Sequence, residues 1–198
     1  KNLKILDIIV EEQPTGEISA GAGVGTSGGT FSIGISENNW LGEGKKLAFD
    51  IQVDEESLAG KLNFTNPNYD FLGNSINYSI SSVGNDKPDQ GYENTVVSAF
   101  IGTAFEQYRD VSVSLGLGAN YDDLRTLDSA SDNLKKQSGT FSDFTASYGF
   151  SYDKRNRAFM PTSGSIISFN QSLPIYADRS SISNTFTSST YKSFNENI

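Results

Sequence analysis

Carboxylates, lysines, arginines and hydroxyls are the residues that could carry chemistry in this chain, because its 198 residues include no Cys and no His. Without Cys and His, the common zinc, haem, iron–sulfur and thiol sites cannot be built, and no His-based triad or neutral-pH proton shuttle is available. The densest charge cluster is DKRNR at residues 153–157. A cluster between two apolar segments is a solvated turn, a structural ion network or a contact surface. We therefore expect no enzyme activity, no cofactor and no metal.

Two pairs of adjacent acids offer a second possible chemistry, either acid–base catalysis or calcium binding. They are Asp122 with Asp123 and Glu55 with Glu56, and both pairs are predicted to lie in loops. Neither pair has the spacing of an EF-hand calcium loop, so solvated loop positions are the simpler interpretation. The GAGVG segment at residues 21–25 is not expected to bind a nucleotide, because it lies on an alternating segment with no helix after it.

The charge balance of the chain argues against nucleic acid as a partner. The chain has 15 Lys and Arg against 24 Asp and Glu, a net charge of −9, whereas neutralising phosphates needs clustered basic residues. No apolar run reaches the roughly 18 to 20 residues that a membrane-spanning helix requires, and no signal-peptide pattern is present. A membrane β-barrel is compatible with this composition, because its strands are apolar only at alternate positions.

Alternation of apolar and polar residues predicts about ten strands and an all-β fold. The clearest alternation runs through Val113, Leu115, Leu117 and Ala119, which are separated by Ser and Gly. The strand near residues 95–105 has a mixed pattern whose two faces cannot be separated. The predicted strands are 17–26, 30–36, 46–53, 58–65, one near 76–80, about 95–105, 111–121, 144–152, 165–173 and about 181–191.

The polar positions of these strands indicate the environment of the sheet. They are mostly Ser, Thr, Gly and Asn, whereas a solvated sheet face usually carries Lys and Glu. Small neutral residues facing a lumen and aliphatic or aromatic residues facing lipid are typical of an outer-membrane barrel. A soluble sandwich or soluble barrel is the alternative.

The connections between strands should alternate between the two sides of a membrane. If the chain enters from the periplasm, the outer loops are 81–94, 120–142 and 174–180, and they include the two longest connections. The inner turns carry a set of aromatic residues that matches a girdle at one membrane interface. These residues are Trp40, Tyr69, Phe71, Tyr108 and Phe159.

Five segments, in order, resemble the BamA family of outer-membrane protein assembly factors. They are QPTGE at 13–17, the Gly-rich first strand, NNWLGEG at 38–44, TNPNY at 65–69 and DKRNRAFMPTSG at 153–164. Two features depart from the family. Asn156 stands where an acid is common, and the family's inward loop with an Arg-Gly-Phe core is absent, since no Arg is followed by Gly. The turn residues that carry the resemblance are Asn39, Trp40, Leu41, Gly42, Asn66, Pro67, Asp153, Arg155, Phe159, Pro161 and Gly164.

The resemblance implies an all-β, antiparallel transmembrane β-barrel with about ten strands of an expected sixteen, truncated at both ends. Residues 1–14 would be the end of the last periplasmic POTRA domain, and residues 15–198 the N-terminal part of the barrel. The location would be the outer membrane of a Gram-negative bacterium, with the N-terminus on the periplasmic side. The expected partners are the lipid bilayer of the outer membrane, unfolded outer-membrane protein clients and accessory assembly lipoproteins.

The resemblance also implies a function without covalent chemistry, namely folding and inserting clients by templating strands at a lateral seam. A client strand would add to the first barrel strand by β-augmentation, and glycines make that strand weak. A related translocation or secretion pore, a porin-like passive channel and a secreted soluble β-protein are the alternatives. The expected client-pairing residues are Glu17, Ile18, Ser19, Ala20, Gly21, Ala22, Gly23, Val24 and Gly25.

Overall fold

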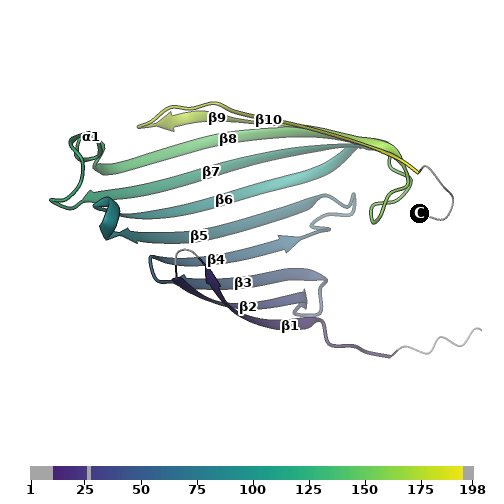
Figure 1. The fold of residues 1–198 in the computed structure, drawn as a ribbon. Helices are drawn as coiled ribbons and strands as arrows, with labels where there is room; N and C mark the ends of the chain where they lie inside the picture. The colour runs from purple at the N-terminus through teal and green to yellow at the C-terminus, as the bar shows by residue number, and fades with distance from the viewer. Residues whose placement is uncertain (1–10, 26–27, 194–198) are drawn as a thin grey trace, which may run out of the picture.

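The computed structural model describes residues 11–25 and 28–193, and these form one ten-stranded antiparallel sheet. Each strand pairs with its neighbours in sequence, in the order β1 to β10, and Figure 1 shows the strands side by side in a curved layer. The all-β antiparallel prediction and its strand number are confirmed. The elements are β1 (Gly16–Gly25), β2 (Gly28–Trp40), β3 (Lys45–Asp54), β4 (Ser57–Asn66), β5 (Ser75–Lys87), the 3-10 helix η1 (Pro88–Gln90), β6 (Tyr92–Tyr108), β7 (Val111–Thr126), α1 (Asp132–Lys135), β8 (Gly139–Asp153), β9 (Ser163–Ala177) and β10 (Ser183–Lys192).

The register places apolar residues of neighbouring strands opposite one another. Ile33 of β2 pairs with Ile51 of β3, and Leu117 of β7 pairs with Ala146 of β8. Because side chains alternate along a strand, one face of the sheet is predominantly apolar, and we call it the apolar face. The opposite face, the polar face, carries mainly Ser, Thr, Asn and Gly, as at the Ser114–Gly149 pair.

The apolar face is not covered by any other part of the described chain. Within the described residues, Ala130 is the one apolar residue that is buried, and many large apolar side chains of the strands are exposed. A soluble sheet of this size would bury this face against a second layer. The arrangement therefore favours a sheet whose apolar face lies against lipid.

Strand β6 is the one whose faces could not be separated from the sequence, and the register resolves them. Ile101 pairs with Tyr78 on one side and Leu117 on the other, so it lies on the apolar face. Phe100 therefore lies on the polar face, where a Cβ on Gly116 would lie 2.5 Å from its Cζ atom. The aromatic ring fills space that glycines leave on neighbouring positions, and this puts an apolar residue on each face of the strand.

Several strands extend beyond the ends that alternation predicted. The predicted loop 81–94 shrinks to 88–91, loop 120–142 shrinks to 127–138, and β9 continues to Ala177. Asp122 and Asp123 lie in β7 rather than in a loop. Among the described connections, the two longest are 127–138 and 154–162, at opposite ends of the sheet, so the prediction that both lie on one side is wrong. Backbone pairing does not require apolar side chains, and the ladder therefore continues past the alternating segment.

The NNWLGEG segment also differs from its prediction as a turn. Its first three residues complete β2, with Trp40 paired to Lys45, and only residues 41–44 form the turn. The backbone of Leu41 adopts a positive φ of 59°, followed by Gly42 at 74°. The turn is therefore tighter than the motif suggested, because two successive residues in the left-handed region reverse the chain within four residues.

The connections fall into two groups at opposite ends of the strands. We call the end with connections 41–44, 67–74, 109–110 and 154–162 the turn rim, and the end with 55–56, 88–91, 127–138 and 178–182 the loop rim. The aromatic residues predicted to form a girdle all lie at the turn rim, and their common placement is confirmed. Their role at a membrane interface stays a prediction. They are Trp40, Tyr69, Phe71, Tyr108 and Phe159.

Residues 1–10 of the expected POTRA segment lie outside the described residues, as does Thr26 at the predicted end of the first strand. Residues 11–15 belong to no strand. Across the described part of the chain, no helix has the length and apolar character needed to span a membrane.

Candidate functional site

Strand β1 lies at one edge of the sheet and pairs on one side only. Its partner is β2, in an uninterrupted register from Gly16 opposite Glu37 to Gly25 opposite Gly28. Among the described residues, no strand pairs with the other edge of β1, and β10 lies at the far edge of the sheet (Figure 1). All ten residues of β1 are exposed. The segment predicted as a client-pairing strand is therefore an edge strand, while client pairing itself stays a prediction.

A hydrogen bond at the start of β1 indicates which backbone groups face the free edge. The N–H of Asn38 donates to the carbonyl of Thr15 at 3.2 Å, one pair beyond the β1–β2 register. Hydrogen-bonded and non-hydrogen-bonded pairs alternate along an antiparallel ladder. The residues whose N–H and C=O point toward β2 are therefore Glu17, Ser19, Gly21, Gly23 and Gly25. The residues whose N–H and C=O point toward the free edge are Ile18, Ala20, Ala22 and Val24.

The side chains of these four edge residues lie on the apolar face. Ile18 pairs with Ile35, and 78% of Ile18 is exposed; Val24 is 92% exposed. The free edge therefore combines unpaired backbone groups with a narrow apolar strip. An added strand could bond to the backbone groups and place its own apolar residues beside the strip.

The glycines of β1 differ in how closely other residues approach them. A Cβ on Gly23 or Gly25 would have no atom of another residue within 4 Å, whereas one on Gly21 would lie 2.9 Å from Oγ of Ser32. Small residues in such a strand could also fit a crowded lumen or a bend, and of these three positions only Gly21 is crowded within the described sheet. Glycine at an uncrowded strand position weakens the strand, which agrees with an edge that pairs weakly.

The charged residues of the β8–β9 turn form ion pairs within the turn and with the neighbouring turn. The guanidinium of Arg155 donates to both carboxylate oxygens of Asp153, with Nε–Oδ1 at 2.9 Å and Nη2–Oδ2 at 2.6 Å. Lys154 pairs with Asp110 of the neighbouring turn at 2.8 Å, and this contact raises the pKa of Lys154 above its ordinary value. These bonds agree with a structural ion network that ties two turns together.

Asn156 takes the position at which the BamA-like motif commonly has an acid. Its Oδ1 accepts from the backbone N–H of Thr162 at 3.1 Å and of Ser163 at 3.2 Å. Its Nδ2 donates to Oγ1 of Thr162 at 2.8 Å. The amide oxygen thus accepts the same kind of backbone bonds that a carboxylate would, and the amide nitrogen adds a third bond across the turn.

The β4–β5 turn is organised by Asp70, which sequence reasoning did not single out. Its Oδ1 accepts from the backbone N–H of Leu72 and Asn74 at 3.0 and 3.1 Å, and its Oδ2 accepts from Nδ2 of Asn74 at 2.6 Å. Phe71 projects from this turn and is fully exposed. Partial desolvation alone would raise the pKa of Asp70, but the bonds from Asn74, Leu72 and Gly73 together outweigh it and hold the pKa below its ordinary value.

The lowered pKa of Asp70 predicts how this turn responds to acid. Its stabilising contribution is fully present above the ordinary pKa and is lost as the pH falls through the lower pKa of the folded turn. The side-chain amide resonances of Asn74, followed by NMR as the pH is lowered, should therefore start to shift below the ordinary range of an Asp, about 3.9. Asp70→Asn should abolish this transition. A wild-type midpoint at the ordinary value would contradict the prediction.

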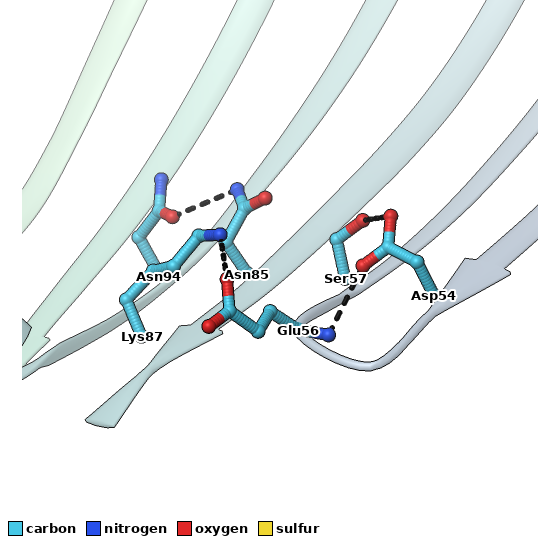
Figure 2. Close-up of polar contacts among 6 residues, drawn as sticks. All are labelled: Asp54, Glu56, Ser57, Asn85, Lys87 and Asn94. Atoms are coloured by element: carbon cyan, nitrogen blue, oxygen red, sulfur yellow. Dashed lines mark hydrogen bonds and ion pairs between the residues drawn. The ribbon is translucent and has the colours of Figure 1, made fainter. Parts of the chain in front are cut away.

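A polar cluster at the loop rim joins connections that are distant in sequence (Figure 2). Asp54 accepts from the N–H of Glu56 at 3.0 Å and from Oγ of Ser57 at 2.6 Å, and Glu56 forms an ion pair with Lys87. Asn85 and Asn94, on β5 and β6, are joined by a side-chain bond of 3.0 Å. The cluster borders a recess of about 430 Å³ that also meets Asp123 and Arg125.

Two pairs of adjacent acids were noted in the sequence, Glu55 with Glu56 and Asp122 with Asp123. The sequence did not predict which groups these side chains bind. Glu56 bonds to Lys87, whereas Glu55 accepts from the N–H of Gly29 at 3.4 Å. Asp123 forms an ion pair with Arg125 at 2.8 Å. In the described part of the chain, no group of three or more His, Cys, Asp or Glu residues could hold a metal ion.

Comparison with known proteins relates this sheet to one superfamily. The model of the Omp85 superfamily domain matches residues 39–198. The outer membrane protein assembly factor BamA of Neisseria meningitidis serogroup B, strain MC58, is 26% identical over 188 residues. That match covers 86% of this chain and 24% of the relative, so the chain spans about a quarter of the relative's length.

A solved structure agrees with this similarity. The crystal structure of BamA from Haemophilus ducreyi lacking POTRA domains 1–3 superposes with a TM-score of 0.72 at 25% sequence identity. The match covers 94% of this chain and 39% of that chain.

Proposed function

Because the chain belongs to the Omp85 superfamily, we propose that it is part of an assembly factor that folds and inserts client proteins into the bacterial outer membrane. The resemblance to the BamA family is confirmed by a curated relative and a solved structure that both carry that name. The matched relative is described as an outer membrane protein assembly factor. Its described role is the basis for assigning this activity to the present chain.

The edge position of β1 in the described sheet is the observation that supports the proposal. Client strands entering a bilayer bring unpaired N–H and C=O groups, each of which costs several kcal/mol in a hydrocarbon environment. Ile18, Ala20, Ala22 and Val24 present complementary backbone groups on an exposed strand. A client strand that bonds to them satisfies its backbone before it leaves water, by β-augmentation. This activity needs no covalent step, no cofactor and no catalytic residue.

The proposal includes an orientation and a set of partners. The apolar face contacts the lipid bilayer, and the turn rim lies on the periplasmic side of a Gram-negative outer membrane. Residues 1–14 would be the end of the last POTRA domain on that side. The exposed Phe71 and Phe159 of the turn rim then lie at the periplasmic interface of the outer membrane. Accessory lipoproteins would approach from the same side.

Disulfide crosslinking tests the proposed client-pairing edge. The chain has no Cys, so Ala20→Cys places a unique thiol on β1. We expect it to form a disulfide with a Cys in the terminal strand of a client during insertion into vesicles. Ala119→Cys is the matched control, because Ala119 also lies on the apolar face but its strand is paired on both sides.

The result separates the proposed function from its alternatives. Crosslinking at residue 20 and not at residue 119 would support templating at the β1 edge. Crosslinks confined to the polar face, for example at Ser114→Cys, would instead indicate a translocation or secretion pore. Ion conduction without any client crosslink would indicate a passive channel.

A further inference from the structure

Strand β1 has few contacts of its own to keep it ordered. Among the described residues it pairs with β2 only, all its residues are exposed, and glycine occupies several of its positions. Glycine loses more conformational freedom on ordering than any other residue. A template strand that must first become ordered spends part of its binding free energy on that ordering. Contacts at the ends of β1 therefore decide whether its edge is ready for a partner.

The start of β1 is held by a group of polar contacts that we call the β1 anchor, formed by Thr15, Glu37, Asn38 and Asn39. The N–H and the Nδ2 of Asn38 both donate to the carbonyl of Thr15, each at 3.2 Å. The side chain of Thr15 lies close to the carboxylate of Glu37. The carboxylate thus links the residue before β1 to the end of β2.

Glu37 is the centre of the anchor because its two oxygens face different segments. Oε1 accepts from the backbone N–H of Asn39 at 2.7 Å, at the end of β2. Oε2 lies beside β1, where a Cβ on Gly16 would be only 3.0 Å away. The register of β2 with β3 shifts just after Glu37. The carboxylate therefore stabilises an irregular strand end and the first residues of β1 together.

We propose that Glu37 is a positioning residue that fixes the start of β1 to β2, so that this pairing persists while the free edge of β1 accepts a client strand. The inference rests on the proposed function and adds a residue to it. Glu37 does not touch the client. It acts through Thr15 and through the backbone N–H of Asn39, and it keeps Glu17 and Ser19 paired with β2.

Glu106 provides a matched comparison elsewhere in the sheet. It also precedes a register shift, between β6 and β7, and its Oε1 also accepts from a turn N–H, that of Asp110 at 3.2 Å. Its strand is paired on both sides. Loss of Glu106 therefore removes the same kind of turn bond without releasing an edge strand.

Hydrogen exchange of the full-length protein in lipid nanodiscs, measured without client, tests the anchor directly. Glu37→Ala should speed exchange at the N–H groups of Glu17 and Ser19 by about tenfold, the effect of losing one charge-assisted hydrogen bond. Glu37→Gln keeps the acceptor for Asn39 and should restore most of the protection. Glu106→Ala should leave exchange in β1 unchanged.

Client insertion into vesicles, measured on the same variants, tests the functional part of the inference. Glu37→Ala should slow insertion several-fold, with Glu37→Gln close to wild type and Glu106→Ala unchanged. Three results would each overturn the inference. The first is unaltered β1 exchange in Glu37→Ala, and the second is an equal effect of Glu106→Ala on β1. The third is faster β1 exchange in Glu37→Ala with normal client insertion. If Glu37→Ala does not fold, Gly16→Ala serves instead, because its Cβ pushes the carboxylate aside; unchanged exchange there would also overturn it.

The two measurements keep this inference separate from the proposed function. Absence of insertion by the wild-type protein would overturn the proposed function. Exchange in β1 would still report whether Glu37 holds the strand, because that measurement uses no client.

Discussion

Proline in place of Ala22 should strongly slow client insertion while the sheet remains folded. The ladder places the N–H of Ala22 at the free edge of β1, away from β2. Proline lacks this donor, and an edge strand tolerates proline where its N–H makes no ladder bond. A client strand meeting this position would have one carbonyl unpaired in lipid, at a cost of several kcal/mol. We therefore expect insertion of a labelled client into vesicles to slow by about tenfold or more.

Proline at Gly21 is the control for this experiment, because the N–H of Gly21 points toward β2. This variant should lose a bond within the β1–β2 pair and should lower the thermal stability of the hairpin. The two neighbouring substitutions thus separate templating from folding. Normal insertion by Ala22→Pro, or equal loss of stability in both variants, would contradict the assignment of the Ala22 N–H to the free edge and of the Gly21 N–H to β2.

Replacing Gly164 with Ala should destabilise the β8–β9 turn more than other Gly→Ala changes in the sheet. Gly164 has a φ of 97°, and a Cβ there would lie 2.1 Å from the carbonyl oxygen of Lys154. The clash is with backbone, so no side-chain rotation relieves it. Strained φ and overpacking together should lower the free energy of unfolding by about 3 kcal/mol.

Gly60→Ala is the matched control for Gly164→Ala. Gly60 lies within β4, and a Cβ there would have no atom within 4 Å apart from its own residue and its two chain neighbours. Urea unfolding in detergent micelles or lipid should show a much smaller loss for this variant. Equal losses at both positions would show that the turn geometry does not depend on glycine at residue 164.

The turn motifs illustrate how much of the candidate site the sequence could predict. Asp153, Arg155 and Gly164 were identified by motif, and the structure joins Asp153 to Arg155 and requires glycine at Gly164. Glu37 and Asp70 were missed, because each acts through backbone groups of its own turn or of a neighbouring strand. The sequence shows only that Glu37 stands two residues before Asn39. This spacing is common, and only the folded backbone shows that the Glu37 carboxylate accepts from the N–H of Asn39.

Strand assignment succeeded where the apolar and polar residues alternate cleanly, as in β7, because alternation is a local property of the chain. Alternation also predicted β6 as a strand but could not separate its two faces, because Phe100 on the polar face covers a glycine of a neighbouring strand. It also placed strand ends too early beside the predicted loop 81–94, since polar residues continued the ladder.

The sequence by itself determined the all-β class, the number and order of the strands, the apolar side of most of them and the family resemblance. These properties follow from period-two alternation and from short turn motifs, and both are local. Only the tertiary structure decided which backbone groups of β1 face its free edge and which residues of β6 lie on each face of the sheet. It also decided that Asp54, Glu56 and Lys87 meet at the loop rim and that Thr15 lies close to Glu37. These depend on register between strands, which is set by pairing across the sheet and not by any one segment.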